Sequence, residues 1–286
     1  MGLEYYHSCP WPEESKQHRL APAVSLSKAG IPCVVWAADA LAFIHLVPTG
    51  LSSLQLLIPD ELVDKATSIL TTQSFQVADT PKEWLEYPMW DRSTPSCYPG
   101  SVALRTTAAE DSLDEDAPRQ VWLHPQSLFS FDVRDHSLSV TLDKFPDTVR
   151  FPTRPAFLDT IFAVILEPPI GFKHRRFHGM MMCYYGRLLQ YTMRGPSRLP
   201  SGEFGEAHKT ALAEVKEENY PYFHHLLSGG QRMAWTEAVA KRREVMRKIG
   251  KGHEVDRPFP RNTAAVEERN AKIAAAAAMQ SIPNPM

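Results

Sequence analysis

The chain has 286 residues, of which 43% are hydrophobic and 22% charged, as is usual for a globular protein that buries its own core. Its 31 Lys and Arg against 33 Asp and Glu leave a net charge of -2, so no overall basic excess indicates nucleic acid or an anionic membrane as partner. The 24 prolines are about 8% of the chain and the 14 glycines about 5%, against typical shares of about 5% and 7%. This composition argues against collagen, a coiled coil and a disulfide scaffold.

The spacing of the cysteines and the residues at the N-terminus indicate in which cellular compartment the protein is expected. The four cysteines form no Cys-x-x-Cys pair, which favours reduced thiols, although disulfides remain an alternative. Residues 1–10 lack the basic and apolar segments of a secretory signal, and no run of 18 apolar residues occurs. We therefore expect no membrane span and a cytoplasmic location, with a nuclear one left open.

The first half of the chain alternates between helical spacing and short apolar runs. Residues 1–20 are polar and interrupted by proline, which indicates a lead-in segment. In chain order we then predict a helix over 21–28, a strand over 31–36, a helix over 39–46, a strand over 53–58, a helix over 60–72 and a strand over 74–78.

The next segment carries loops and further strands. Residues 80–100 are rich in proline and aromatic side chains, and we interpret them as an irregular packed connection, with a stacking platform for a base or sugar as the alternative. Residues 110–116 hold five acids and no base, which indicates a solvated loop or, alternatively, a cation site. The strands predicted here cover 101–107, 120–124, 128–133 and 137–142.

Beyond Pro152 the pattern becomes almost entirely helical. Helices are predicted over 157–165, 174–194, 206–218 and 231–249, and the Ala-rich segment 264–280 has little apolar face. The predicted fold class is α+β, a small mixed sheet flanked by helices and followed by a helical region. The predicted division is a lead-in (1–20), an α/β domain (21–150), a helical region (151–250) and a flexible tail (251–286).

The stretch from Ala29 to Leu41, AGIPCVVWAADAL, resembles the opening of the nucleotidyltransferase fold, in particular of the minimal, toxin-type members. In that family a strand of the type Gly-Ile-Pro-Tyr-Val-Leu leads into a Gly-Gly or Gly-Ser turn and a short helix. A second strand carrying Asp-x-Asp follows, and residues 51–60, LSSLQLLIPD, stand in its place. The resemblance is good over residues 21–78 and only architectural over 120–230.

The resemblance implies particular site residues. The family's two carboxylates hold divalent metals, and its glycine turn lets backbone amides approach the triphosphate. Here the Asp-x-Asp positions fall on Ser53 and Gln55, the glycine positions fall on Ala37 and Ala38, and the segment expected to supply a third carboxylate, 121–124, contains no acid. We therefore predict a degenerate member, without metal or cofactor, that acts as a binding or interaction module for a nucleotide or a protein. Ala37, Ala38, Ser53 and Gln55 would line its ligand site.

Two alternative functions stay open. Asp39 and Asp60 could be relocated catalytic acids of an active, magnesium-dependent nucleotidyl or phosphoryl transferase, although acids at helix N-termini commonly serve only the helix dipole. RNA binding is the other alternative, because residues 231–286 hold 11 Lys or Arg against 6 Asp or Glu. The pair His174 and His178 has a spacing that zinc sites use, but the sequence offers no obvious third ligand.

Overall fold

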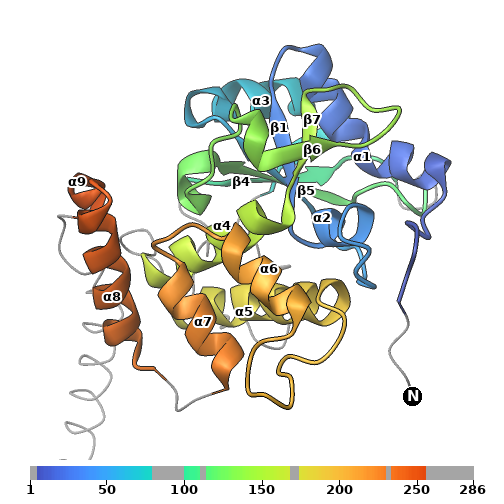
Figure 1. Ribbon diagram of the computed structural model, residues 1–286. Coiled ribbons are helices and arrows are strands. Elements are labelled where there is room, and N and C mark those ends of the chain that lie inside the picture. The colour runs from blue at the N-terminus through green and yellow to red at the C-terminus, as the bar shows by residue number, and fades with distance from the viewer. Residues whose placement is uncertain (1–4, 79–99, 110–113, 168–173, 230–232, 256–286) are drawn as a thin grey trace, which may run out of the picture.

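The computed structural model describes residues 5–78, 100–109, 114–167, 174–229 and 233–255. Within these residues one mixed sheet of seven strands lies beside a group of helices (Figure 1). The strand order across the sheet is β3-β4-β5-β2-β1-β7-β6. The strands are β1 (Cys33–Trp36), β2 (Leu54–Ile58), β3 (Phe75–Val77), β4 (Val102–Thr106), β5 (Gln120–Pro125), β6 (Ser139–Thr141) and β7 (Val149–Pro152).

Helices cover both faces of the sheet. The α-helices are α1 (Glu13–Lys28), α2 (Ala37–Phe43), α3 (Val63–Thr71), α4 (Arg154–Leu166), α5 (His174–Thr192), α6 (Glu206–Glu214), α7 (Tyr220–Ser228), α8 (Trp235–Lys248) and α9 (Gly252–Val255), and short 3-10 turns are η1 (Asp60–Leu62), η4 (Gln126–Phe129) and η5 (His136–Leu138). In the view of Figure 1, α1 and α3 pack together above the sheet, whereas α2 and the helices from α4 onward lie below it. The mixed fold class and the change to helices after Pro152 are confirmed.

The central strands run in both directions. β1 is antiparallel to β2 and parallel to β7, and β2 is parallel to β5. All four residues of β1 are buried, as expected of a strand with helices on both faces. Because successive side chains of a strand point to opposite faces, Cys33 lies toward α1 and Trp36 toward α4.

One aromatic contact joins the sheet to the helical half. The indole of Trp36 stacks on the ring of Phe157 in α4, with 4.4 Å between ring centroids, and both side chains are fully buried. Phe129 in η4 completes this contact at 5.2 Å from Trp36. The two halves of the chain therefore share one hydrophobic core.

Several predicted elements differ from the structure. Helix α1 begins at Glu13, so residues 13–20 of the expected lead-in are helical. Arg19, Leu20, Ala23 and Leu26 of this helix are buried, a pattern that is hard to recognise in the sequence because Pro12 precedes the helix and Pro22 lies within it. The strand predicted over 128–133 is wrong, because the buried apolar residues there lie in η4 and the loop after it. Strand β7 and helix α7 were not predicted as such.

Candidate functional site

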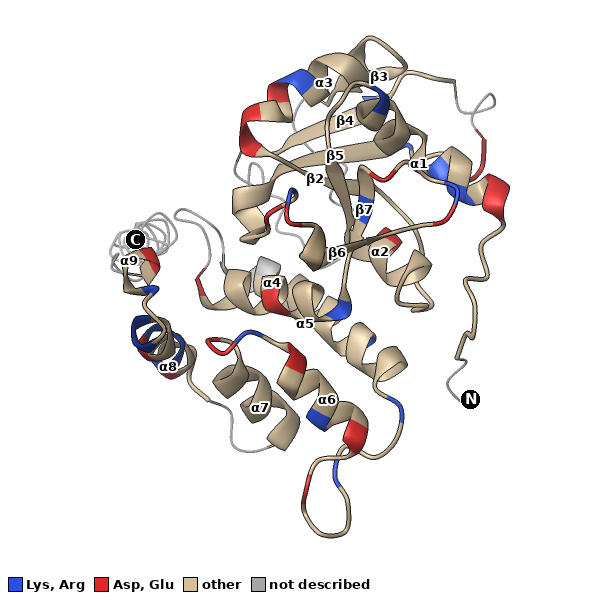
Figure 2. Cartoon of the chain, turned by 45° about the horizontal axis from the view of Figure 1, so that its top comes forward, with Lys and Arg blue, Asp and Glu red and all other residues tan. Residues whose placement is uncertain are grey.

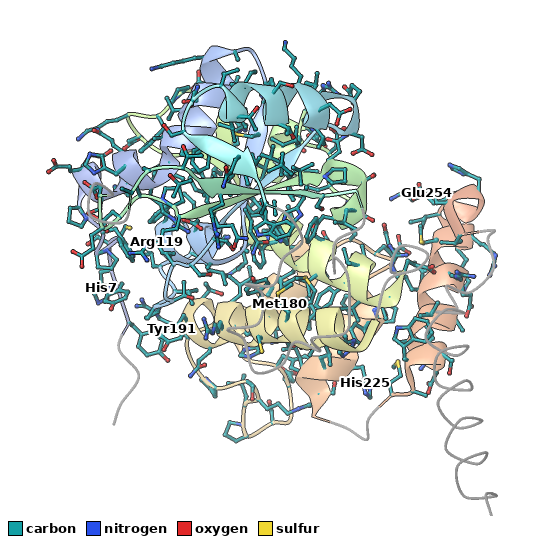
Figure 3. The ribbon with its side chains drawn as sticks, turned by 180° about the vertical axis from the view of Figure 1, so that it is seen from behind. His7, Arg119, Met180, Tyr191, His225 and Glu254 are labelled. Atoms are coloured by element: carbon teal, nitrogen blue, oxygen red, sulfur yellow. The ribbon has the colours of Figure 1, made fainter. Side chains whose placement is uncertain are left out.

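A cleft of about 670 Å³ opens at one end of three neighbouring strands, where the segment before β2, the end of β4 and the start of β5 meet. Of the four residues expected to line a ligand site, Ser53 lines this cleft, whereas Ala37, Ala38 and Gln55 are not among its described lining residues. Three arginines, Arg19, Arg105 and Arg119, contribute to its wall, and Figure 3 labels Arg119 beside the sheet. Trp11 adds an aromatic surface from the segment that precedes α1. Figure 2 shows the acidic and basic residues of the described chain by colour, with charges of both signs around the end of the sheet near α1.

Strand register places Gln55 in the middle of a row across three strands. Gln55 is paired with Trp36 of β1 and with Trp122 of β5. Paired residues of neighbouring strands point to the same face, so all three side chains face the helical half. The position that the resemblance assigns to a carboxylate is therefore occupied by an amide between two indoles.

The segment expected to supply a third carboxylate instead supplies His124. Its Nδ1 lies 2.8 Å from Ser101 Oγ and its Nε2 lies 3.3 Å from Gln55 Oε1. Burial lowers the pKa of His124 to about 3, so the imidazole is neutral. With Gln55 Oε1 as acceptor, the ring proton sits on Nε2 and Nδ1 accepts from the Ser101 hydroxyl. Gln55, His124 and Ser101 thus form a neutral hydrogen-bonded chain.

Asp39 forms a buried ion pair with Arg19. Its carboxylate is fully buried and accepts from Arg19 Nε at 2.7 Å and from Arg19 Nη2 at 3.1 Å. Arg19 Nη1 also donates to the carbonyl of Ser52 at 2.9 Å, just before β2. This pair holds α1, α2 and the start of β2 together at the inner wall of the cleft.

Ala37 and Ala38 form the first turn of α2, directly after β1. Ala37 has a φ of 59°, in the left-handed region that glycine adopts without steric cost. The backbone at this position thus has a conformation that favours glycine, while its side chain is a buried methyl group.

Asp60 lies away from the cleft. It follows the last residue of β2 by two positions, whereas Ser53 precedes the first, so the two lie at opposite ends of this strand. The Asp60 carboxylate accepts from the backbone amide of Ser127 at 3.0 Å. Asp39 and Asp60 are therefore not brought together, and each contacts a partner within the fold.

The cleft contains acids that the sequence pattern did not assign to a site. Glu115 and Asp116 line it from the segment before β5, and Oδ2 of neighbouring Asp114 lies 2.5 Å from His18 Nδ1. The solvated-loop interpretation of residues 110–116 agrees with the exposure of Asp114 and Glu115, while residues 110–113 lie outside the described part. With its guanidinium groups, hydroxyls and indole, the cleft offers donors for phosphate or carboxylate oxygens.

The structure also bears on the metal ligands, membrane spans and cysteines considered in the sequence. No three His, Cys, Asp or Glu side chains lie close enough together to hold a metal ion within the described residues. No helix in the same part of the chain is long and apolar enough to cross a membrane. Cys9, Cys33 and Cys183 are free thiols. The aromatic cluster in 80–100, Cys97 and the segment 264–280 lie outside the described residues.

The arginines of the cleft were not among the residues predicted to form a site. Arg19 stood in the expected lead-in, and Arg105 and Arg119 stood at the ends of predicted strands. Only strand pairing brings the last two together, through the hydrogen bond from Thr106 N to the Arg119 carbonyl at 3.0 Å. Comparison with protein-family models and with curated proteins found no match for this chain.

Proposed function

We propose that this protein is a nucleotidyltransferase-like binding module whose cleft at the start of β2 holds a nucleotide without metal-dependent nucleotidyl transfer. The observation that carries the proposal is a neutral hydrogen-bonded chain with Ser101, formed by Gln55, at a position where the resemblance implies a metal-binding carboxylate, and by His124, in the segment expected to supply another. Neutral amide, imidazole and hydroxyl groups do not supply the hard, charged oxygens that magnesium prefers.

The state of Asp39 supports the same proposal. A carboxylate whose two oxygens both accept from one buried guanidinium is compensated already, and moving it onto a metal would leave Arg19 buried without its partner. Arg19 is already paired with Asp39, so Arg105 and Arg119 are the arginines of the cleft wall that would bind phosphate oxygens, and Trp11 would supply a ring on which a base stacks.

Calorimetry with each nucleoside triphosphate, with and without magnesium, tests the binding, and release of pyrophosphate tests the chemistry. We expect binding without turnover. Replacing Arg105 or Arg119 with Ala would weaken binding about tenfold to a hundredfold, the range for a lost charge-assisted hydrogen bond. The matched control is Arg134→Ala, because Arg134 is an exposed arginine that pairs with Glu61 on the turn after β2. Absence of binding to any nucleotide would overturn the proposal.

A second candidate function is an active transferase with relocated acids, and the presence of Glu115 and Asp116 in the cleft favours it. It predicts magnesium-dependent pyrophosphate release that is lost in a Glu115→Gln/Asp116→Asn double variant. Turnover that survives in this double variant and is lost in Asp39→Asn would instead assign the chemistry to Asp39.

A further inference from the structure

A second cavity, of about 310 Å³, lies in the helical half. Its walls come from α4, from the segment that links α6 to α7, from α8 and from α9. Figure 3 labels Glu254 of this cavity and Arg119 of the cleft on opposite sides of the molecule. The second cavity is therefore separate from the cleft, and its role is independent of the proposed function.

This cavity is lined by a buried arginine, Arg242, whose partners differ from those of the other buried arginines. The buried arginines among the described residues are Arg19, Arg242 and Arg243, exposed by 4%, 7% and 5%. Arg19 forms a two-pronged pair with Asp39, and Arg243 forms one with Glu167 at 2.5 and 2.8 Å. Arg242 has no carboxylate partner of this kind in the described part of the chain, although it lines the cavity.

The contacts of Arg242 leave part of its guanidinium unused. Nε donates to Asn219 Oδ1 at 3.0 Å, and Nη1 lies 3.0 Å from Met246 Sδ, a weak acceptor. No acceptor among the described residues contacts Nη2. A guanidinium presents its donors in a planar fork that fits the two oxygens of a carboxylate. The open positions of Arg242 therefore suit an acceptor supplied from outside the chain.

The same cavity also presents negative charge. Glu218 is 5% exposed, and its Oε1 lies 3.3 Å from Lys251 Nζ. Asp159 accepts at Oδ1 from the Lys216 amide and from Asn219 Nδ2, and burial raises the pKa of this carboxyl. Glu254 adds a further carboxylate at the rim.

The balance of these charges decides the class of ligand. Asp159, Glu167, Glu218 and Glu254 line the cavity together with Lys216, Arg242 and Lys251, and Arg243 compensates Glu167 from behind. Four acids and four bases give no net charge, so the cavity as a whole does not attract a ligand that carries a single negative charge. A ligand with one positive and one negative group meets complementary charge at both ends.

We propose that this cavity binds a small zwitterion of the α-amino-acid class. Its carboxylate would pair with the Arg242 fork, and its ammonium group would lie toward Glu218 and Glu254. Ala163, Met246 and Val255 form the apolar part of the wall and would contact its side chain. The cavity volume is at the lower end of the range for small-molecule sites, about 300–1,000 Å³, which matches a ligand of this size.

Calorimetry and thermal unfolding with each of the twenty L-amino acids, one at a time, test the proposal. Acetate and methylamine serve as probes that carry only one of the two charges. We expect at least one amino acid to bind and to raise the unfolding temperature, and both single-charge probes to bind at least tenfold more weakly. Absence of binding by all twenty amino acids, or equally tight binding of acetate, would overturn the proposal.

Variants test the role of Arg242. Arg242→Met should abolish binding, and Arg242→Lys, which keeps the charge but loses the fork, should weaken it at least tenfold. Lys248→Met removes an exposed cation from the same helix and should leave binding unchanged. If Arg242→Met does not fold, as judged by near-ultraviolet circular dichroism, Arg242→Lys decides the outcome. Unchanged affinity in a folded Arg242→Lys protein would assign Arg242 a structural role and overturn the proposal.

Discussion

Removing the carboxylate of Asp39 tests whether this residue acts in structure or in catalysis. In Asp39→Asn the Arg19 guanidinium keeps its buried place, at 4% exposure, but loses both charged acceptors. Breaking one side of a buried ion pair costs about 3–5 kcal/mol, because the remaining charge is left uncompensated. For a chain of this size each kcal/mol lowers the unfolding temperature by about 2–4 °C, so the expected decrease is about 6–20 °C.

A compensating variant separates loss of the pair from loss of volume. Arg19→Met/Asp39→Leu replaces both charges with apolar side chains of similar length, and such replacements of buried pairs are often neutral in stability. We expect this double variant to recover most of the stability lost in Asp39→Asn, although the hydrogen bond from Arg19 Nη1 to the Ser52 carbonyl remains missing. That bond is worth about 0.5–1.5 kcal/mol.

Differential scanning calorimetry and urea unfolding measure both effects, with the pyrophosphate assay run on the same samples. A structural role for Asp39 would be refuted if Asp39→Asn unfolded within about 2 °C of the unchanged protein, less than the shift for one kcal/mol. It would also be refuted if the double variant lost as much stability as the two single variants added together. Loss of turnover in a fully stable Asp39→Asn protein would instead mark Asp39 as a catalytic acid.

Three further predictions concern the sheet. The pKa of His124 is lowered to about 3, so the unfolded chain takes up a proton near pH 6.5 that the folded chain refuses. Stability should therefore fall as the pH drops below about 6.5, by up to about 1.4 kcal/mol per pH unit from this group, and His124→Gln should flatten urea-unfolding profiles between about pH 7 and 5. A double-mutant cycle of Trp36→Ala and Phe157→Ala should give a coupling energy of about 0.5–1.5 kcal/mol; a value near zero would contradict the stacked contact. Ser53→Asp/Gln55→Asp should create a Mn²⁺ site measurable by electron paramagnetic resonance, which the neutral Ser53→Asn/Gln55→Asn control should lack; equal signals from both would count against the assigned register.

Local sequence patterns correctly predicted those strands and helices whose own residues carry a clear apolar run or helical periodicity. The apolar run of β1, the stretch of β2 with its following proline, and the periodic stripe of α3 all lie close to their predicted positions. Each of these elements is specified by its own residues. The segment 128–133 was wrongly predicted as a strand, because its buried apolar side chains reach the core from a 3-10 turn, and a short apolar run does not distinguish these two conformations.

The site was less predictable because its partners are distant in the chain. Asp39 could be recognised as an acid at the start of a helix, but its partner Arg19 lies twenty residues earlier, in a segment whose helix is concealed by two prolines. The contact between Gln55 and His124 spans 69 residues and depends on the parallel pairing of β2 with β5. A single sequence carries no signal for such pairings, since each residue is ordinary in its local context.

Ala37 connects the scarcity of glycine with the proposed loss of catalysis. Its left-handed backbone costs a non-glycine residue about 1–2 kcal/mol, and the chain accepts this cost at a position where glycine would avoid it. The methyl group of Ala37 is buried in the core beside Trp36. The backbone conformation at this position thus favours glycine, whereas the alanine side chain contributes to core packing. This combination is what we expect if the turn now serves packing, with ligand recognition left to the arginines of the cleft.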